Sequence, residues 1–267
     1  DQPAYKAGLK TGDLIIAVNK KSTMNMELQE VVSEIKKKEN KKVVLTIYRD
    51  KKSKDYTVKK SSVQLDTVSY KMKEKKIGYI AVSQFLENTG DQFDKAVTAL
   101  EKKGMKSLII DLRDNGGGLL NTCTQMVSRV IDKDKLIVYT KDKEGNKEEF
   151  KSDSGKTLEI PIIILVNGNT ASASEIMTGC LKDYGKATVV GTTTYGKGIV
   201  QNIMPLTDGS AIKFTIAKYY TPNGTDIHKK GIKPDVKVKM SDAQWKKAQT
   251  DEKADKQLKK AIELLEK

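Results

Sequence analysis

The feature that most constrains the fold is the chain's most apolar run, residues 160–166, which leads into an Asn-Gly-Asn turn and then a helix-like stretch. Residues 108–112 form a second run, apolar except for Asp111, which leads into three glycines and another helical stretch. Strands that are apolar at every position are typical of sheets covered on both faces. Because these strands alternate with helices, we expect an α/β (mixed α+β) fold with a partly parallel sheet.

Changes of pattern divide the 267 residues into four parts. We expect a small mixed domain, a lysine-rich connector, a larger domain and a C-terminal helix, at residues 1–62, 63–76, 77–240 and 241–267. In the small domain, apolar residues at positions 28, 31, 32 and 35 have helical spacing. The apolar stripe of the C-terminal helix fits the core or a second subunit equally well.

The excess of positive charge suggests a nucleic-acid partner, but its make-up argues against one. Lys and Arg number 49 against 35 Asp and Glu, a net charge of +14, yet only Arg49, Arg113 and Arg129 are arginines. Arg is the residue that reads guanine edges and stacks on bases. We therefore expect no nucleic-acid partner, and interpret the charge as a solvated lysine coat or an attraction to anionic surfaces.

The cysteine and histidine content argues against a metal enzyme. Cys123 and Cys180 stand in helix-like surroundings, so we expect two small buried residues and no disulfide. A single histidine leaves few nitrogen ligands, and we expect no metal and no cofactor. The longest apolar run is too short to span a bilayer, and no signal peptide is visible, although the sequence starts as if inside a folded unit.

The segment LVNGNTASASEI, residues 165–176, contains the candidate nucleophiles. Ser172 and Glu175 have the spacing of a helix capping box, which is the plain structural interpretation. A serine at a sharp strand-to-helix turn is also the arrangement of a nucleophile elbow, beside the partial positive charge of a helix N-terminus. Thr170, Ser172 and Ser174 all carry hydroxyls, and spacing alone does not choose among them.

A nucleophilic serine needs a base, and the sequence offers two. His228 is the only histidine, and Lys197 lies between Gly196 and Gly198 at the entry to an apolar strand. A lysine buried in such a turn would favour its neutral amine, and Ser-Lys pairs are a known variant of the triad. The glycines at 116–118 follow a buried strand and suggest an oxyanion hole, a phosphate cradle or a plain turn.

Four motifs in this order, DLRDNGGG, VNGNTASASEI, TTYGKGIVQ and HKKGIKPDV, resemble the C-terminal processing peptidases, also called tail-specific proteases. Before them, PAYKAGLKTGDLIIAVN resembles a PDZ domain of the bacterial protease-associated kind. The first strand and carboxylate-binding loop of that domain would lie upstream of Asp1, so we expect a truncated PDZ domain followed by a Ser-Lys protease domain.

The resemblance implies roles for individual residues. Ser172 would be the nucleophile, Lys197 the general base, and Gln201 the residue that positions the lysine amine. The oxyanion hole would use the N–H of Ala173 and of Gly117 or Gly118. Weaker transfers are Asp183, which matches an aspartate in some relatives' sites or caps its helix, His228 as a structural residue, and Arg49 as a sensor of a bound substrate tail.

The resemblance implies a serine endopeptidase that cleaves exposed C-terminal or unfolded segments of polypeptides. It also implies an extracytoplasmic location, a possible homodimer, and membrane association only through a missing N-terminal segment. Two other functions remain open. One is a peptide-binding module on an inactive protease fold, and the other is a small-molecule ester or thioester hydrolase, since glycine oxyanion loops also serve thioesters.

Overall fold

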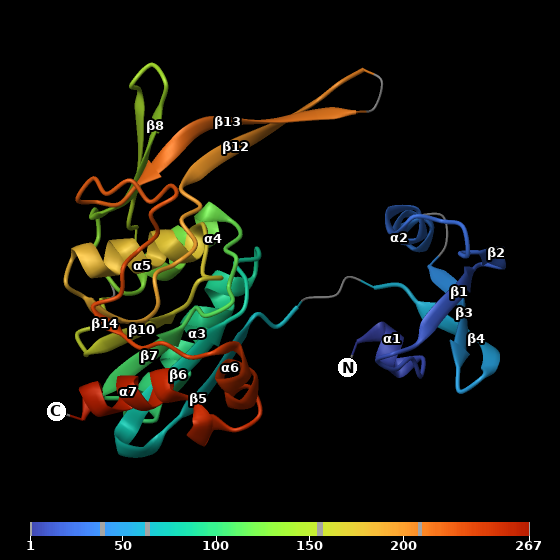
Figure 1. Ribbon diagram of the computed structural model, residues 1–267, viewed down its shortest axis with the longest axis horizontal. Helices are drawn as coiled ribbons and strands as arrows, with labels where there is room; N and C mark the ends of the chain where they lie inside the picture. Colours follow the sequence, from blue (N-terminus) through green and yellow to red (C-terminus); the bar gives the residue numbers. More distant parts are fainter. Residues whose placement is uncertain (1, 38–40, 62–64, 154–156, 208–209, 267) are drawn as a thin grey trace. The chain divides into compact units, whose positions relative to one another are not determined.

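The computed structural model describes residues 2–37, 41–61, 65–153, 157–207 and 210–266. It divides into two compact units, Asp1–Leu65 and Asp66–Lys267 (Figure 1). Within the described residues, no helix is long and apolar enough to cross a membrane.

The first unit is a four-stranded sheet with two helices. The strand order is β2-β1-β3-β4, and neighbouring strands are antiparallel. Burial alternates along β3, so one face of the sheet packs on a small core with Val18, Leu45 and Ile47. The elements are α1 Pro3–Lys6, β1 Leu14–Val18, β2 Lys21–Ser22, α2 Leu28–Lys36, β3 Lys42–Arg49 and β4 Lys52–Lys59. The helix predicted from the spacing of residues 28, 31, 32 and 35 is confirmed as α2.

The second unit is built on a six-stranded sheet of order β14-β11-β10-β7-β6-β5. All neighbours are parallel except β5, which pairs antiparallel with β6. The predicted mixed, partly parallel sheet is therefore confirmed. Its strands are β5 Val68–Met72, β6 Ile77–Val82, β7 Ser107–Asp111, β10 Ile162–Val166, β11 Ala187–Gly191 and β14 Val236–Lys237.

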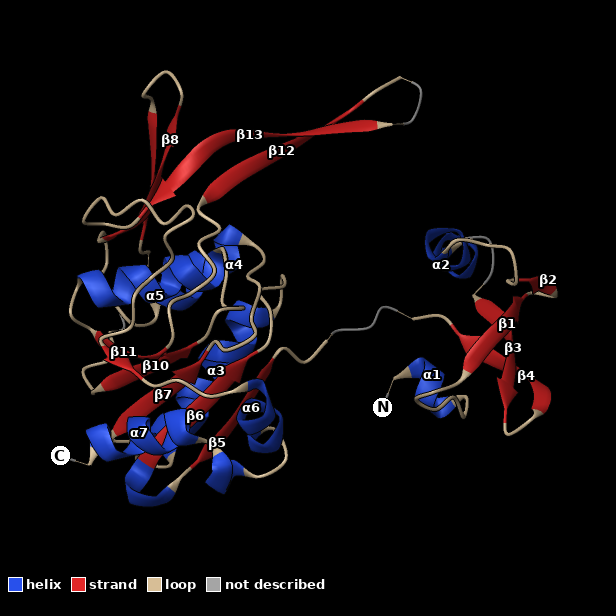
Figure 2. Ribbon diagram, viewed as in Figure 1, coloured by secondary structure: helices blue, strands red, loops and turns tan. Residues whose placement is uncertain are grey.

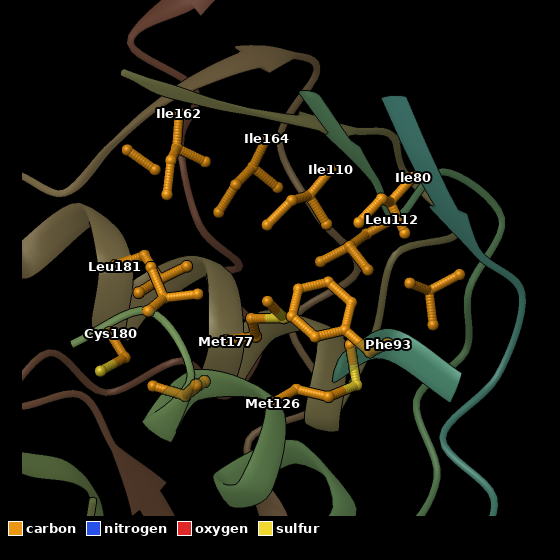
Figure 3. Packing of buried hydrophobic residues seen from close by; sticks show 14 of the residues in the cluster. Ile80, Phe93, Ile110, Leu112, Met126, Ile162, Ile164, Met177, Cys180 and Leu181 are labelled. Atoms are coloured by element: carbon orange, nitrogen blue, oxygen red, sulfur yellow. The ribbon is translucent and has the colours of Figure 1, made fainter. Parts of the chain in front are cut away.

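Helices cover both faces of this sheet (Figure 2). Leu108, Ile110 and Ile164 point to one face and pack against α3 Thr89–Lys102, α4 Leu120–Ser128 and α5 Ala173–Asp183, as Figure 3 shows for part of this core. Ile109 and Ile163 point to the other face and pack against α7 Lys256–Leu265. Burial on both faces explains why β10 is apolar at every position and β7 is apolar from Leu108 to Ile110, and each buried Ile contributes about 1.5–3 kcal/mol.

A second sheet, of order β12-β13-β8-β9, is antiparallel throughout. In this sheet β8 Leu136–Asp142 and β9 Lys147–Lys151 form a hairpin. The strands β12 Ile199–Pro205 and β13 Ala211–Tyr220 form the long ribbon seen in Figure 1.

Two segments differ from their expected form. The segment expected as a connector, residues 63–76, contains β5 and the 3-10 turn Glu74–Lys76, because its apolar positions pair with β6 and join the sheet; residues 62–64 lie outside the described part. The C-terminal part consists of α6 Asp242–Ala248, the 3-10 turn Glu252–Ala254 and α7, with Asp255 as the N-cap of α7. The stripe of α7 packs on the core.

Candidate active site

The strand β10 and the helix α5 meet at a sharp turn that ends in Ser172. Ser172 has a φ of 58° and a ψ of −119°. A non-glycine residue in this region costs on the order of 1–3 kcal/mol and persists only where the surrounding structure imposes it. The conformation agrees with a serine held at a strand-to-helix elbow at the N-terminus of α5.

The three hydroxyls of this turn are now distinguished. Thr170 and Ser174 are fully buried, and each hydroxyl donates to a backbone carbonyl, that of Leu112 at 2.8 Å and that of Asn115 at 3.0 Å. Ser172 is partly exposed. The hydroxyls of Thr170 and Ser174 therefore stabilise the turn, and the hydroxyl of Ser172 is the one that a substrate can reach.

Glu175 is the buried centre of the site. Its carboxylate accepts four hydrogen bonds from neutral groups, although the residue is 0% exposed. Oε1 accepts from the Thr194 hydroxyl at 2.5 Å and from the Gly196 N–H at 2.6 Å. Oε2 accepts from the Ser172 N–H at 2.9 Å and from the Lys197 N–H at 2.8 Å. One carboxylate thus joins the turn before α5 to the loop before β12.

The backbone N–H of Lys197 is bound to Glu175, whereas the lysine side chain lies at the surface. The side chain is exposed, so the expectation of a buried lysine is wrong for this conformation. Gly196 and Gly198 are buried because they pack against the segment around His228: a Cβ on Gly198 would lie 2.5 Å from the His228 nitrogen. These contacts hold the backbone and leave the long side chain on the surface. Between these two described residues, no hydrogen bond joins the Lys197 amine to the Ser172 hydroxyl.

The glycine loop lies against the serine turn. Gly117 has a φ of +96°, and a Cβ on it would lie 2.8 Å from the Ser172 Cβ and 2.9 Å from the Ala173 nitrogen. The Gly117 N–H already donates to Oδ1 of Asn115 at 2.9 Å. The N–H groups of Gly118 and Ala173 have no acceptor among the residues described. Of the two candidate glycines, Gly118 therefore has the free donor that an oxyanion hole requires.

Asn115 holds this loop in place and was not singled out by sequence reasoning. It is 0% exposed, and its amide donates to the Val82 carbonyl at 2.8 Å. Its own carbonyl accepts from the Ala171 N–H at 3.0 Å as well as from the Ser174 hydroxyl. The polar residue directly before three glycines was the available signal, since such a residue often fixes a turn.

Gln201 and Asp183 lie away from these contacts. Gln201 is exposed on β12, opposite Thr215, so its role in positioning the lysine amine stays a prediction. Asp183 is the last residue of α5, at the end opposite Ser172, and accepts from the Asn223 N–H at 2.8 Å. This contact supports a structural role for Asp183.

His228 and Arg49 make local contacts in their own units. The backbone N–H of His228 donates to Oδ1 of Asp226 at 2.9 Å. The buried ring nitrogen Nδ1 has no hydrogen-bond partner in the described structure. The Arg49 guanidinium donates a hydrogen bond to each carboxylate oxygen of Asp13, at 2.5 and 2.6 Å. These hydrogen bonds lower the pKa of Asp13 to about 2. Arg49 therefore stabilises the first unit, and its role as a sensor stays a prediction.

Sequence reasoning also missed a buried cluster of charged side chains, which includes two residues that precede the glycine loop in the sequence. The Arg113 side chain binds Asp111 in a fork and donates to Asp255 at 2.9 Å. Tyr79 donates to Asp111 at 2.7 Å, and burial raises the pKa of that phenol. The cluster joins the end of β7 to the N-cap of α7. Its signal was the three charged residues of DLRD, which begin at the last position of a largely apolar strand.

Cys123 and Cys180 are buried, unpaired thiols on α4 and α5, as predicted. Burial raises the pKa of the Cys123 thiol to about 12. Such thiols are protonated at neutral pH and unreactive, so neither competes with Ser172 as a nucleophile.

The fold and this arrangement agree with the match to known families. The family described as Peptidase family S41 matches residues 76–238, and a PDZ domain matches residues 1–49. The chain belongs to peptidase family S41, as its motifs predicted, and carries a PDZ domain before the peptidase domain.

Two groups of relatives are similar to the chain. It is 42% identical over 238 residues to a probable CtpA-like serine protease of Staphylococcus aureus (strain N315), and 42% identical over 241 residues to the carboxy-terminal processing protease CtpA of Bacillus subtilis (strain 168). These alignments cover 88% and 90% of this chain but 48% and 52% of the relatives, so the chain spans about half their length. A solved photosystem II D1 C-terminal processing protease matches with a TM-score of 0.61 at 30% identity, over 88% of this chain and 65% of that one.

Proposed function

We propose that the chain is a serine endopeptidase that cleaves extended or C-terminal segments of polypeptides, with Ser172 as nucleophile and Lys197 as general base. The observation that carries the proposal is the carboxylate of Glu175, which binds the backbone N–H of both residues on one oxygen. It sets the two loops side by side. The family membership and the names of the relatives support the same reaction class.

In the first half of the reaction, the neutral Lys197 amine takes the proton from the Ser172 hydroxyl as the oxygen attacks the scissile carbonyl. The oxyanion that forms is stabilised by the N–H groups of Ala173 and Gly118, at the positive end of α5. Lys197 then gives the proton to the leaving amine, and the acyl-enzyme remains on Ser172. In the second half, Lys197 removes a proton from water, the water attacks the ester, and the bond between the acyl carbon and the Ser172 oxygen breaks as Lys197 returns the proton to that oxygen.

This scheme requires Lys197 to lose its positive charge before it can accept a proton. Its side chain is exposed to water in this structure. A substrate strand that covers the site removes water from the amine and favours its neutral form. We therefore propose that substrate binding completes the dyad, since hydrogen bonds of resting sites often tighten only in the complex.

The test is cleavage of an unfolded protein substrate by wild type and by the variants Ser172→Ala, Lys197→Ala and His228→Ala. The first two should lose cleavage and the third should keep it, because His228 has a structural role here. Cleavage that persists in Lys197→Ala would overturn the dyad. Turnover of thioesters with no cleavage of polypeptides would assign the site to a small-molecule hydrolase.

A further inference from the structure

The ribbon formed by β12 and β13 exposes more apolar surface than a solvated hairpin normally does. Met204 and Ile212 are each 47% exposed, and Phe214 is 39% exposed. Contiguous apolar surface on a soluble protein usually marks an interaction site. The strand β12 begins two residues after Lys197, so the ribbon follows directly on the loop that carries this candidate residue.

The strand register gathers these side chains on one face. Met204 pairs with Ile212 and Val200 with Ala217, while Phe214 faces Asn202. Directly paired residues share a face, and alternate residues along β12 share it too. We call this surface, Val200, Asn202, Met204, Ile212, Phe214 and Ala217, the apolar ribbon face. It carries no charge. The opposite face presents Gln201, Ile203, Lys213 and Thr215.

The free edge of β12 is closed to another strand over its outer half. Asn202 Oδ1 accepts from the Ile203 N–H at 2.8 Å, so that N–H points away from β13 and already has a partner. Two residues further, Pro205 has no N–H to offer. Such features protect sheet edges from strand addition. A partner of the ribbon therefore binds through side chains on the apolar ribbon face.

At its base, the apolar ribbon face opens into a cavity of about 390 Å³. Val200 and Leu120 both line it, three residues after Lys197 and three residues after Gly117. The cavity is therefore lined by the segments that follow the lysine loop and the glycine loop in the sequence. Its other apolar lining comes from Phe150, Ile216, Ala217 and Tyr219, and its polar lining from Thr140, Asp142, Asn146, Lys147 and Glu148.

We propose that the apolar ribbon face is a binding site for extended, apolar segments of the polypeptide substrate, which place one apolar side chain in the cavity at the base of the ribbon. The inference rests on the proposed function. Its support is the row of uncharged, exposed side chains along the ribbon, which begins three residues after Lys197 and continues into the apolar wall of the cavity. An unfolded chain exposes apolar side chains that a folded protein buries, so the site favours unfolded substrates.

The test is a binding measurement that does not depend on cleavage. Reduced, carboxymethylated α-lactalbumin labelled with fluorescein serves as the unfolded probe, and its anisotropy is followed with the Ser172→Ala form of the full chain. The double variant Ile212→Ser/Phe214→Ser removes apolar surface from the ribbon face. Its matched control is Ile203→Ser, which removes an apolar side chain that is 61% exposed on the opposite face. The measurement is made at high salt, which screens the attraction between the probe and the protein's net charge of +14.

We expect the dissociation constant to rise about tenfold in the double variant and less than about twofold in the control. The proposal would be overturned if the double variant bound the probe as tightly as the protein with the unmodified ribbon. It would also be overturned if Ile203→Ser weakened probe binding as much as the double variant does. Sedimentation of the same proteins tests the other occupant: a dimer that only the double variant dissociates, with probe binding unchanged, would assign the face to a second copy. A chain that binds the probe in this way but cleaves nothing would refute the proposed function alone.

Discussion

Ser172 and Lys197 donate their backbone N–H groups to the same oxygen, Oε2 of Glu175, at 2.9 and 2.8 Å. The carboxylate is buried, and its other oxygen binds Thr194 and Gly196. The spacing between the two candidate catalytic residues therefore depends on a third residue that need not touch the substrate. Glu175 is a positioning residue in this account.

Replacing Glu175 by Gln tests this role. The glutamine side chain has the same size as glutamate, but its NH₂ group would face groups that are themselves hydrogen-bond donors. Each donor left without an acceptor in this buried site costs about 1–3 kcal/mol of stability. We expect kcat on an unfolded substrate to fall by at least about a hundredfold and KM to change little, because the loops shift while the substrate surface remains. Glu159→Gln, at an exposed glutamate, is the control. A kcat for Glu175→Gln equal to that of the control would contradict the role.

The glycine loop offers a matched pair of substitutions. A Cβ on Gly117 would collide with the backbone of Ala171 at 2.7 Å and with Ala173, whereas a Cβ on Gly116 meets nothing within 4 Å. We expect Gly117→Ala to lower activity by at least about tenfold and stability by about 1–3 kcal/mol, because its φ is also positive. Gly116→Ala should stay near wild type. Steady-state cleavage and urea unfolding of both variants decide the matter, and equal behaviour would refute the packing argument.

The Arg113 cluster should dominate the stability of the second unit. Arg113→Met leaves the buried carboxylates of Asp111 and Asp255 without their cation, and removing one partner of such a group costs about 3–5 kcal/mol. The control Lys151→Met breaks an exposed pair with Glu149 and should cost less than about 1 kcal/mol. Denaturant unfolding followed by Trp245 fluorescence measures both. Equal losses in the two variants would show that the cluster is not a major source of stability.

The pair of Arg49 and Asp13 predicts an acid-sensitive first unit. The pKa of Asp13 is lowered to about 2, so its carboxylate contributes stability that is complete above its unfolded pKa of about 4. That contribution is lost as the pH falls toward 2, when the folded carboxyl takes up its proton. Arg49→Met should flatten this part of the pH dependence of unfolding and lower stability at pH 7. A variant that keeps the wild-type slope between pH 4 and pH 2 would show that the pair does not set it.

The fold was predictable where one pattern determined one structure. The apolar runs that became β7 and β10 could be buried only inside a covered sheet, and apolar residues at helical spacing produced α2. The segment that became β5 was misjudged because its lysines hid an alternation that pairs with β6. Local sequence does not show which strand will accept an edge segment, since that depends on contacts formed across the chain.

The candidate site was predictable in its residue types and motifs, but not in its connections. Ser172 and Lys197 were named from the sequence, while Glu175 looked like a helix cap and Asn115 like part of a turn. Their importance comes from hydrogen bonds between segments far apart in the sequence, from Glu175 to the loop before β12 and from Asn115 to the serine turn. The exposure of Lys197 was also beyond sequence reasoning, because an apolar strand that follows a residue does not bury that residue's side chain.

The most direct test of the central claim is covalent labelling of Ser172 by a fluorophosphonate, in which the serine oxygen displaces fluoride from phosphorus and loses its proton to the base. Mass spectrometry locates the adduct and measures its rate in wild type, Lys197→Ala and His228→Ala. The account predicts labelling at Ser172 in wild type and in His228→Ala, and a rate lower by at least about a hundredfold in Lys197→Ala. Labelling of Lys197→Ala at the wild-type rate would show that another group activates the serine and would contradict the account.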